Sequence, residues 1–192
     1  VLVPWCRHQT RVDMADAKQI AKCVKEGGKK GVELAGCADL GGLEFFTTQM
    51  QEPKGDCDLL QMCMDAANKE IDPNEEESKG GSGEVGKMLL SAGDTGLALI
   101  NYVPASKADK VNAEEWMAAT LKEVGGGEVK KSSPTTCVAY VAENKEQGRF
   151  VLKDKDTCQA QSVQFLKSKG LFPQADEEED DWVPDESADI EW

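Results

Sequence analysis

The residues that could perform nucleophilic or metal chemistry are one histidine, His8, and a set of cysteines. The cysteines are Cys6, Cys23, Cys37, Cys57, Cys63, Cys137 and Cys158. A nucleophile activated by histidine needs a histidine within reach, as do most catalytic zinc sites. His8 lies within residues 1–13, which show no periodic pattern. The sequence therefore predicts no catalytic residue, no metal site and no cofactor.

The cysteines are predicted to be reduced thiols, most of them in the core. Their number is odd, and no two form a CxxC pair. The closest pair, Cys57 and Cys63, is six residues apart, whereas an all-cysteine zinc site needs four converging thiols. Scattered thiols are typical of a reducing compartment, so we expect a cytoplasmic protein. A small enzyme that uses a thiol such as Cys37 or Cys137 stays open as a further interpretation.

A glycine-rich stretch, residues 79–87, partly matches the phosphate-binding pattern GxxxxGK[ST]. Gly81, Gly86 and Lys87 have the required spacing, but Met88 stands where the pattern needs a hydroxyl for magnesium. A phosphate-binding loop also follows a strand and opens a helix, whereas this stretch leads into a predicted strand. We interpret residues 71–86 as a flexible loop.

The charge is unevenly distributed along the chain. The net charge is −14, and ten of the 36 acidic residues lie in residues 176–191. Without those ten the balance is 22 − 26 = −4. Such a distribution disfavours autonomous binding of nucleic acid and favours basic protein partners. No apolar run approaches the roughly 18–20 residues of a membrane span.

The acidic residues 174–192 are predicted to form a disordered tail that docks to a partner. Asp180 and Asp181 precede Trp182, and Trp192 follows another acidic stretch. Aromatic residues among acids are typical of short motifs that anchor in a pocket while charge steers the approach. Solvated disorder without docking is the open alternative.

Hydrophobic periodicity and turn residues predict alternating helices and strands. The predicted helices span residues 16–26, 56–70, 112–124 and 156–170. The predicted strands span residues 31–35, 43–50, 87–92, 97–103, 135–142 and 149–152. Gly27-Gly28 is expected to stop the first helix, and residues 149–152 to pair with residues 135–142. Strands 87–92 and 97–103 flank Gly93-Asp94-Thr95-Gly96 and form the clearest hairpin.

These elements predict a mixed α/β fold of the α+β type: a mixed β-sheet with a central hairpin, covered by about four helices. We divide the chain into an N-terminal helix or arm at 14–30, a mixed domain at 31–173 and the tail. For residues 1–13, upstream translation, a vector remnant and a fragment end are all open explanations, so they could be a non-native leader.

Residues 86–127 resemble the C-terminal globular, DHH-associated domain of alanyl-tRNA synthetase. The likeness rests on a short strand at 87–93, a return strand ending at Tyr102-Val103-Pro104, and a helix led by Ala113-Glu114-Glu115-Trp116 that runs into Gly125-Gly126-Gly127. It extends more loosely over residues 43–170. The family continues its glycines with a basic residue and Ala-Gln, whereas this chain has residues 128–133, Glu-Val-Lys-Lys-Ser-Ser.

The resemblance implies a non-catalytic binding domain associated with tRNA or with a translation-associated protein. It points to the glycine turn and its neighbouring lysines as the binding residues: Lys107, Lys110, Gly125, Gly126, Gly127, Lys130 and Lys131. The alternative is an acidic adaptor or chaperone-like protein that binds basic partners through Asp180, Asp181, Trp182 and Trp192.

Overall fold

The computed structural model describes residues 6–74 and 77–172, with side chains from residue 17 on. The helices are α1 (Cys6–Gly41), α2 (Cys57–Asn68), α3 (Ala113–Lys122) and α4 (Val151–Ser168), with short 3-10 helices η1 (Ala105–Lys107) and η2 (Lys145–Gln147). The strands are β1 (Phe45–Gln49), β2 (Gly86–Ala92), β3 (Gly96–Tyr102), β4 (Glu128–Ser132) and β5 (Thr136–Ala142). None of the described helices is long and apolar enough to cross a membrane.

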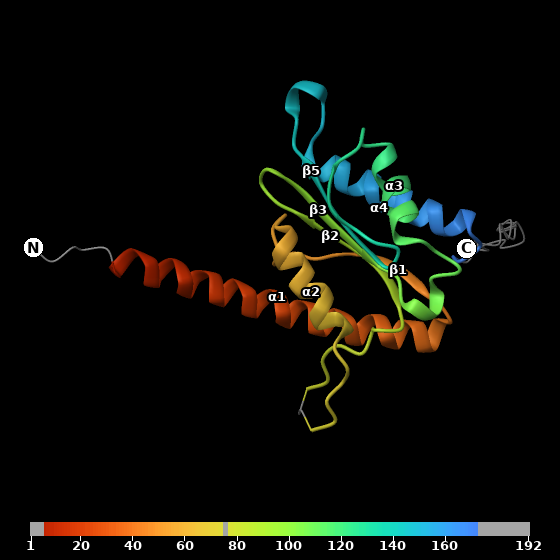
Figure 1. Cartoon of the computed structure of the whole chain (residues 1–192), viewed down its shortest axis with the longest axis horizontal. Coiled ribbons are helices and arrows are strands. Elements are labelled where there is room, and N and C mark those ends of the chain that lie inside the picture. Colours follow the sequence, from red (N-terminus) through yellow and green to blue (C-terminus); the bar gives the residue numbers. More distant parts are fainter. Residues whose placement is uncertain (1–5, 75–76, 173–192) are drawn as a thin grey trace, which may run out of the picture.

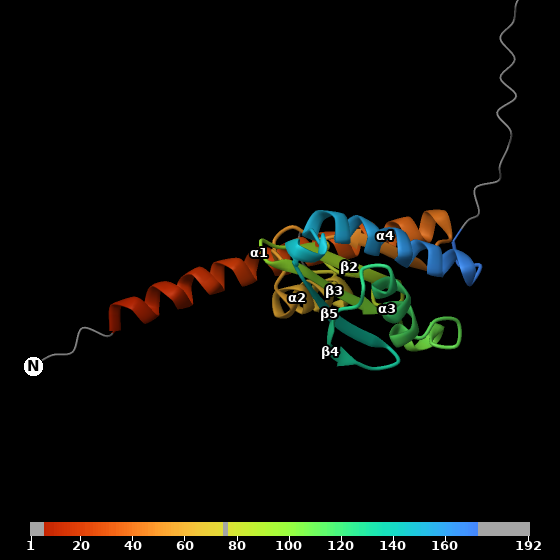
Figure 2. The ribbon, with the colours of Figure 1, turned by 90° about the horizontal axis from the view of Figure 1, so that it is seen from above.

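The five strands form one mixed sheet in the order β1-β2-β3-β5-β4. β1 runs parallel to β2, and the other neighbouring pairs are antiparallel. Helices α1 and α2 cover one face of the sheet and α3 and α4 the other (Figures 1 and 2). The predicted α+β fold, with a central hairpin in a mixed sheet under four helices, is confirmed.

The central hairpin β2–β3 is buried on both faces, so its side chains point alternately into two cores. Met88 and Leu90 pack with α3 and α4, whereas Leu89 between them packs with α1 and α2. Along β3, Leu99 and Ile100 divide in the same way. Period-two alternation therefore serves two helical layers at once.

The prediction that Gly27-Gly28 ends the first helix is wrong, because α1 continues to Gly41. The proposed strand at residues 31–35 is likewise wrong, since those residues are helical. The glycines instead let α1 approach α2: a Cβ atom on Gly27 would lie 2.3 Å from the carbonyl oxygen of Cys63, and one on Gly31 2.6 Å from that of Ala67. Two glycines four residues apart thus form a contact surface rather than a stop signal.

The strand predicted at residues 149–152 is also wrong. Only an isolated bridge joins Asn144 to Arg149, and α4 begins at Val151 rather than after Asp156. The partner of β5 is β4, a strand that the sequence did not predict because all five of its residues are exposed and three of the first four are charged. Without an apolar alternation, such a strand has no period-two signal.

Lys87 on β2 is completely buried and has no carboxylate partner among the described residues. Its Nζ donates to Asn68 Oδ1 at 2.6 Å and to the carbonyl oxygen of Ser82, and lies 5.0 Å from the centre of the Tyr102 ring. Burial, assisted by the charge of Lys107, lowers the pKa of Lys87 from 10.5 to about 7. The side chain thereby fastens the returning connection, residues 80–85, to the sheet.

The close contact of α1 with α2 predicts that Gly27→Ala is destabilising. Alanine favours a helix over glycine by about 1 kcal/mol, but the new methyl group would clash with backbone that cannot yield, at a cost of roughly 1–3 kcal/mol. Gly36→Ala is the matched control, because nothing lies within 4 Å of its added Cβ. Urea unfolding should show Gly36→Ala more stable and Gly27→Ala less stable than the parent; equal effects would contradict the contact.

The burial of Lys87 predicts that stability rises with pH above about 7. There the unfolded chain holds a proton on this lysine that the folded chain has released, so the free energy of unfolding increases by up to about 1.4 kcal/mol per pH unit. Lys87→Met should remove that slope, and the exposed Lys167→Met should keep it. Denaturation under reducing conditions between about pH 6.5 and 7.5 measures this, because the unfolded thiols, with pKa values of about 8.5, are still almost fully protonated there. The same slope in Lys87→Met and the parent would refute it.

Candidate ligand-binding site

The structure separates the predicted binding residues into two groups at opposite ends of the sheet. Gly125–Gly127 lie beside the last residues of β5, since a Cβ on Gly127 would come within 3.0 Å of the Tyr140 carbonyl oxygen. Lys107 and Lys110 follow β3, whose last residue, Tyr102, pairs with the first residue of β5. The strands are seven residues long, so about 20 Å separates the two ends.

Lys107 and Lys110 both face Glu44, which precedes β1. Lys110 Nζ lies 2.5 Å and Lys107 Nζ 4.0 Å from its carboxylate. The hydrogen bond from Lys110 lowers the pKa of Glu44. These lysines therefore join the connection after β3 to the start of β1, and they do not share a surface with the glycines.

The triple glycine ends α3 in a Schellman arrangement. The Gly126 N–H donates to the carbonyl oxygen of Leu121 at 3.0 Å, and the Gly125 N–H donates to that of Lys122 at 3.3 Å. Gly125 and Gly126 have φ angles of 73° and 91°, which favour glycine. Nothing lies within 4 Å of a Cβ built on either residue, so the turn leaves open space.

That open space is part of a hollow of about 400 Å³ between the glycine turn and the start of α4. Its walls include Gly125–Gly127, Tyr140, Asn144 and Arg149, with Glu128 and Glu143 also contributing. Lys130 is not among these lining residues, but its ammonium lies 5.1 Å from the centre of the ring of Tyr140, which is. Lys131 is exposed on the same strand and pairs with Val138. Of the predicted binding residues, Gly125–Gly127 line the hollow, and Lys130 is linked to it only through its contact with Tyr140.

Arg149 is the residue of this hollow that the sequence analysis missed. Its Nη2 donates to the carbonyl oxygen of Gly126 at 3.0 Å, and its Nε lies 3.7 Å from the buried Asp154 carboxylate. The Arg149 Nε and Asp154 Oδ2 atoms have no hydrogen-bond partner among the described residues. One signal could have found it, because Arg149 is the only arginine after Arg11. The arrangement holds a guanidinium under an open glycine turn.

Five of the cysteine thiols are poor nucleophiles in this fold. Burial raises the pKa of Cys23, Cys57, Cys63 and Cys137, and it raises that of Cys158 to about 12. A nucleophilic thiol needs the opposite shift. Cys137, one candidate of the thiol-enzyme interpretation, is therefore unsuited, whereas Cys37 is exposed on α1. The predicted docking residues Asp180, Asp181, Trp182 and Trp192 lie outside the described residues.

Comparison with known proteins gives only weak structural similarity. No protein-family model and no curated protein matches the chain. Among solved structures, the C-Ala domain of alanyl-tRNA synthetase from Aquifex aeolicus matches 65% of this chain and 88% of that domain, with a TM-score of 0.34 and 14% identity. The resemblance predicted from residues 86–127 is thus accompanied by a loose structural likeness, which does not by itself place the chain in that family.

Proposed function

We propose that this chain is a non-catalytic binding domain, similar to the C-terminal module of alanyl-tRNA synthetase, that contacts tRNA at the end of the sheet formed by the glycine turn. One observation carries the proposal: the hollow there combines an open glycine backbone with the Arg149 guanidinium. Lys130, which does not line the hollow, lies over the ring of Tyr140, which does. A translation-associated protein in place of tRNA would use the same surface.

The groups in the hollow suit single-stranded or looped RNA. Guanidinium and ammonium groups contact phosphate, and the aromatic face of a tyrosine can stack on an unpaired base. The lack of side chains on Gly125 and Gly126 lets a sugar-phosphate backbone approach closely. Arg149 is held in place by Gly126 and Asp154, so little side-chain freedom is lost when a ligand binds.

Charge limits how strong such binding can be. The net charge of −14 repels phosphate at long range, and Glu128 and Glu143 line the same hollow. With two or three cations in contact, the expected dependence of affinity on salt is shallow, with a slope of about −0.7 per neutralised phosphate. We therefore expect the chain to bind tRNA with a modest affinity that comes from direct contacts and is best measured at low salt.

The second candidate is the acidic adaptor, favoured by the ten acids and two tryptophans of residues 176–192. It requires no RNA contact and uses the tail to bind a basic protein. Deletion of residues 176–192 distinguishes the two functions. An adaptor would lose its salt-sensitive capture of basic proteins, whereas tRNA binding at the hollow would persist or improve.

The lysines on β4, next to Tyr140, predict that Lys130→Glu with Lys131→Glu weakens tRNA binding about tenfold and makes the salt dependence shallower by about one unit of slope. Both lysines are exposed, so the fold should be unaffected. Lys167→Glu, on the exposed side of α4, is the matched control and should bind as the parent does. The measurement is a mobility-shift titration with labelled tRNA at low salt. No binding by the parent, together with no change in any interaction of the double variant, would refute the proposal.

A further inference from the structure

Four lysines form a stripe along the exposed side of α1. Lys18, Lys22, Lys25 and Lys29 follow one another at intervals of four, three and four residues, which places them on one side of the helix. All four are exposed. Lys22 lies 3.7 Å from the Glu52 carboxylate, and within the part of the chain that the structure describes the other three make no ion pair. We call this set the lysine stripe.

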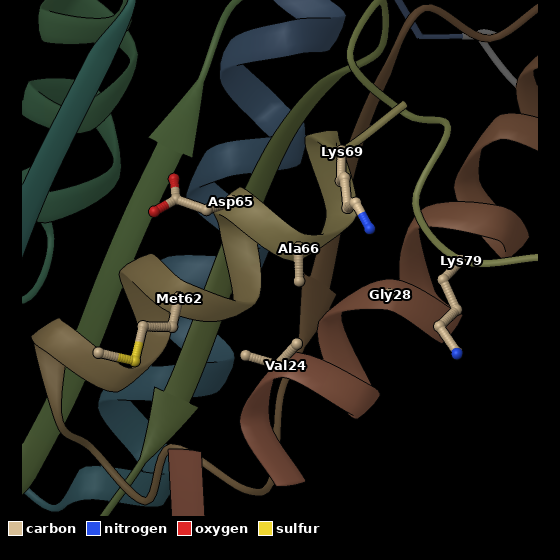
Figure 3. Close-up of a pocket in the computed structure, with 7 residues that line it drawn as sticks. All are labelled: Val24, Gly28, Met62, Asp65, Ala66, Lys69 and Lys79. Carbon is tan, nitrogen blue, oxygen red and sulfur yellow. The ribbon is translucent and has the colours of Figure 1, made fainter. Parts of the chain in front are cut away.

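An apolar groove runs beside the lysine stripe, between α1 and α2. Val24 on α1 faces Met62 and Ala66 on α2 across it, and its lining is completed by Gly28, Asp65, Lys69 and Lys79 (Figure 3). The groove has a volume of about 480 Å³, and Val24 is 44% exposed. Val24 and Gly28 are each followed by a lysine of the stripe, which lies about 100° further round the helix, so the stripe occupies the side of α1 that neighbours the groove.

The acidic tail starts at the end of α1. Leu171 and Phe172, the last residues described before it, line one hollow together with Gly41–Glu44. From Gly41 back to Lys29 is about 18 Å along the helix, and to Lys18 about 35 Å, at 1.5 Å per residue. An extended chain covers about 3.3 Å per residue, so the tail can span the whole stripe.

The order of residues in the tail matches the order of features along α1. Its first acids, residues 176–181, come within reach of Lys29 and Lys25. Trp182, ten residues after Phe172, can extend about 33 Å, whereas the groove at Val24–Gly28 lies about 20–26 Å from Gly41. The later acids, residues 185–191, then reach Lys22 and Lys18.

We propose that residues 176–191 fold back along α1 of the same chain, with their carboxylates against the lysine stripe and the Trp182 indole in the groove. The tail is favoured as the occupant because its acidic residues complement the lysine stripe and because its length is sufficient to reach the groove. Tethering adds an effective concentration in the millimolar range, which favours the tail over a separate acidic partner or a second copy. The proposal is independent of RNA binding at the glycine turn. It implies that a basic partner of the tail competes with α1.

The methyl group of Met62 provides the test, because an indole ring in the groove would displace its resonance by a ring current. With the full chain labelled at methionine methyl groups, the Met62 signal should move when Trp182→Ala is introduced, while that of the buried Met117 stays in place. Lys25→Glu with Lys29→Glu should produce most of the same movement, as should 1 M salt, where the Debye length is about 3 Å. Lys122→Glu with Lys153→Glu, also at exposed positions, is the matched control and should produce none.

Three results would overturn the proposal. The Met62 signal could be insensitive to Trp182→Ala, which would leave the groove without the indole. It could respond to Trp192→Ala instead, which would contradict the order given above. It could change on dilution of the parent, which would show that the occupant is a second molecule of the chain.

Discussion

The structure depends on the burial of the β2–β3 hairpin on both faces. Once both faces of a sheet are covered, every polar group in its centre must find a partner inside the protein. Asn101 illustrates the constraint: its Nδ2 donates to the Ala113 carbonyl oxygen, and its Oδ1 accepts from the Cys137 N–H. One side chain thereby joins the central strand to the start of α3 and to β5. Lys87 does the same for the connection after α2.

The elements that the sequence predicted correctly are those that carry their own signals. The hairpin has apolar strands on either side of a glycine-containing turn, and α2 and α3 begin at capping residues. Asp56 accepts from the N–H groups of Asp58 and Leu59, and Asn112 from those of Glu114 and Glu115. These interactions are local, so residue type and spacing were sufficient to place them.

The elements that could not be predicted depend on contacts between distant residues. Gly27 and Gly31 favour a helix end by type, and only the carbonyl groups of α2 explain why the helix continues past them. The hollow beside the glycine turn has the same origin, because Arg149, whose Nη2 donates to the Gly126 carbonyl oxygen, lies 23 residues further along the chain. In the sequence, a glycine turn indicates only a helix end. That it could bind a ligand becomes apparent only when the structure places Arg149 beside it.

Strand β4 forms one edge of the sheet with every side chain exposed. An edge strand offers unpaired backbone groups to any other strand, and charged lysines are a common protection against edge-to-edge polymerisation. Lys130 and Lys131 provide this protection here, and the irregular register between Val129 and Lys131 adds to it. The same two lysines thus keep the molecule from self-associating through its sheet, whatever else they contact. Replacing either lysine with an apolar residue of high β-propensity would therefore remove this protection and favour aggregation through the sheet edge.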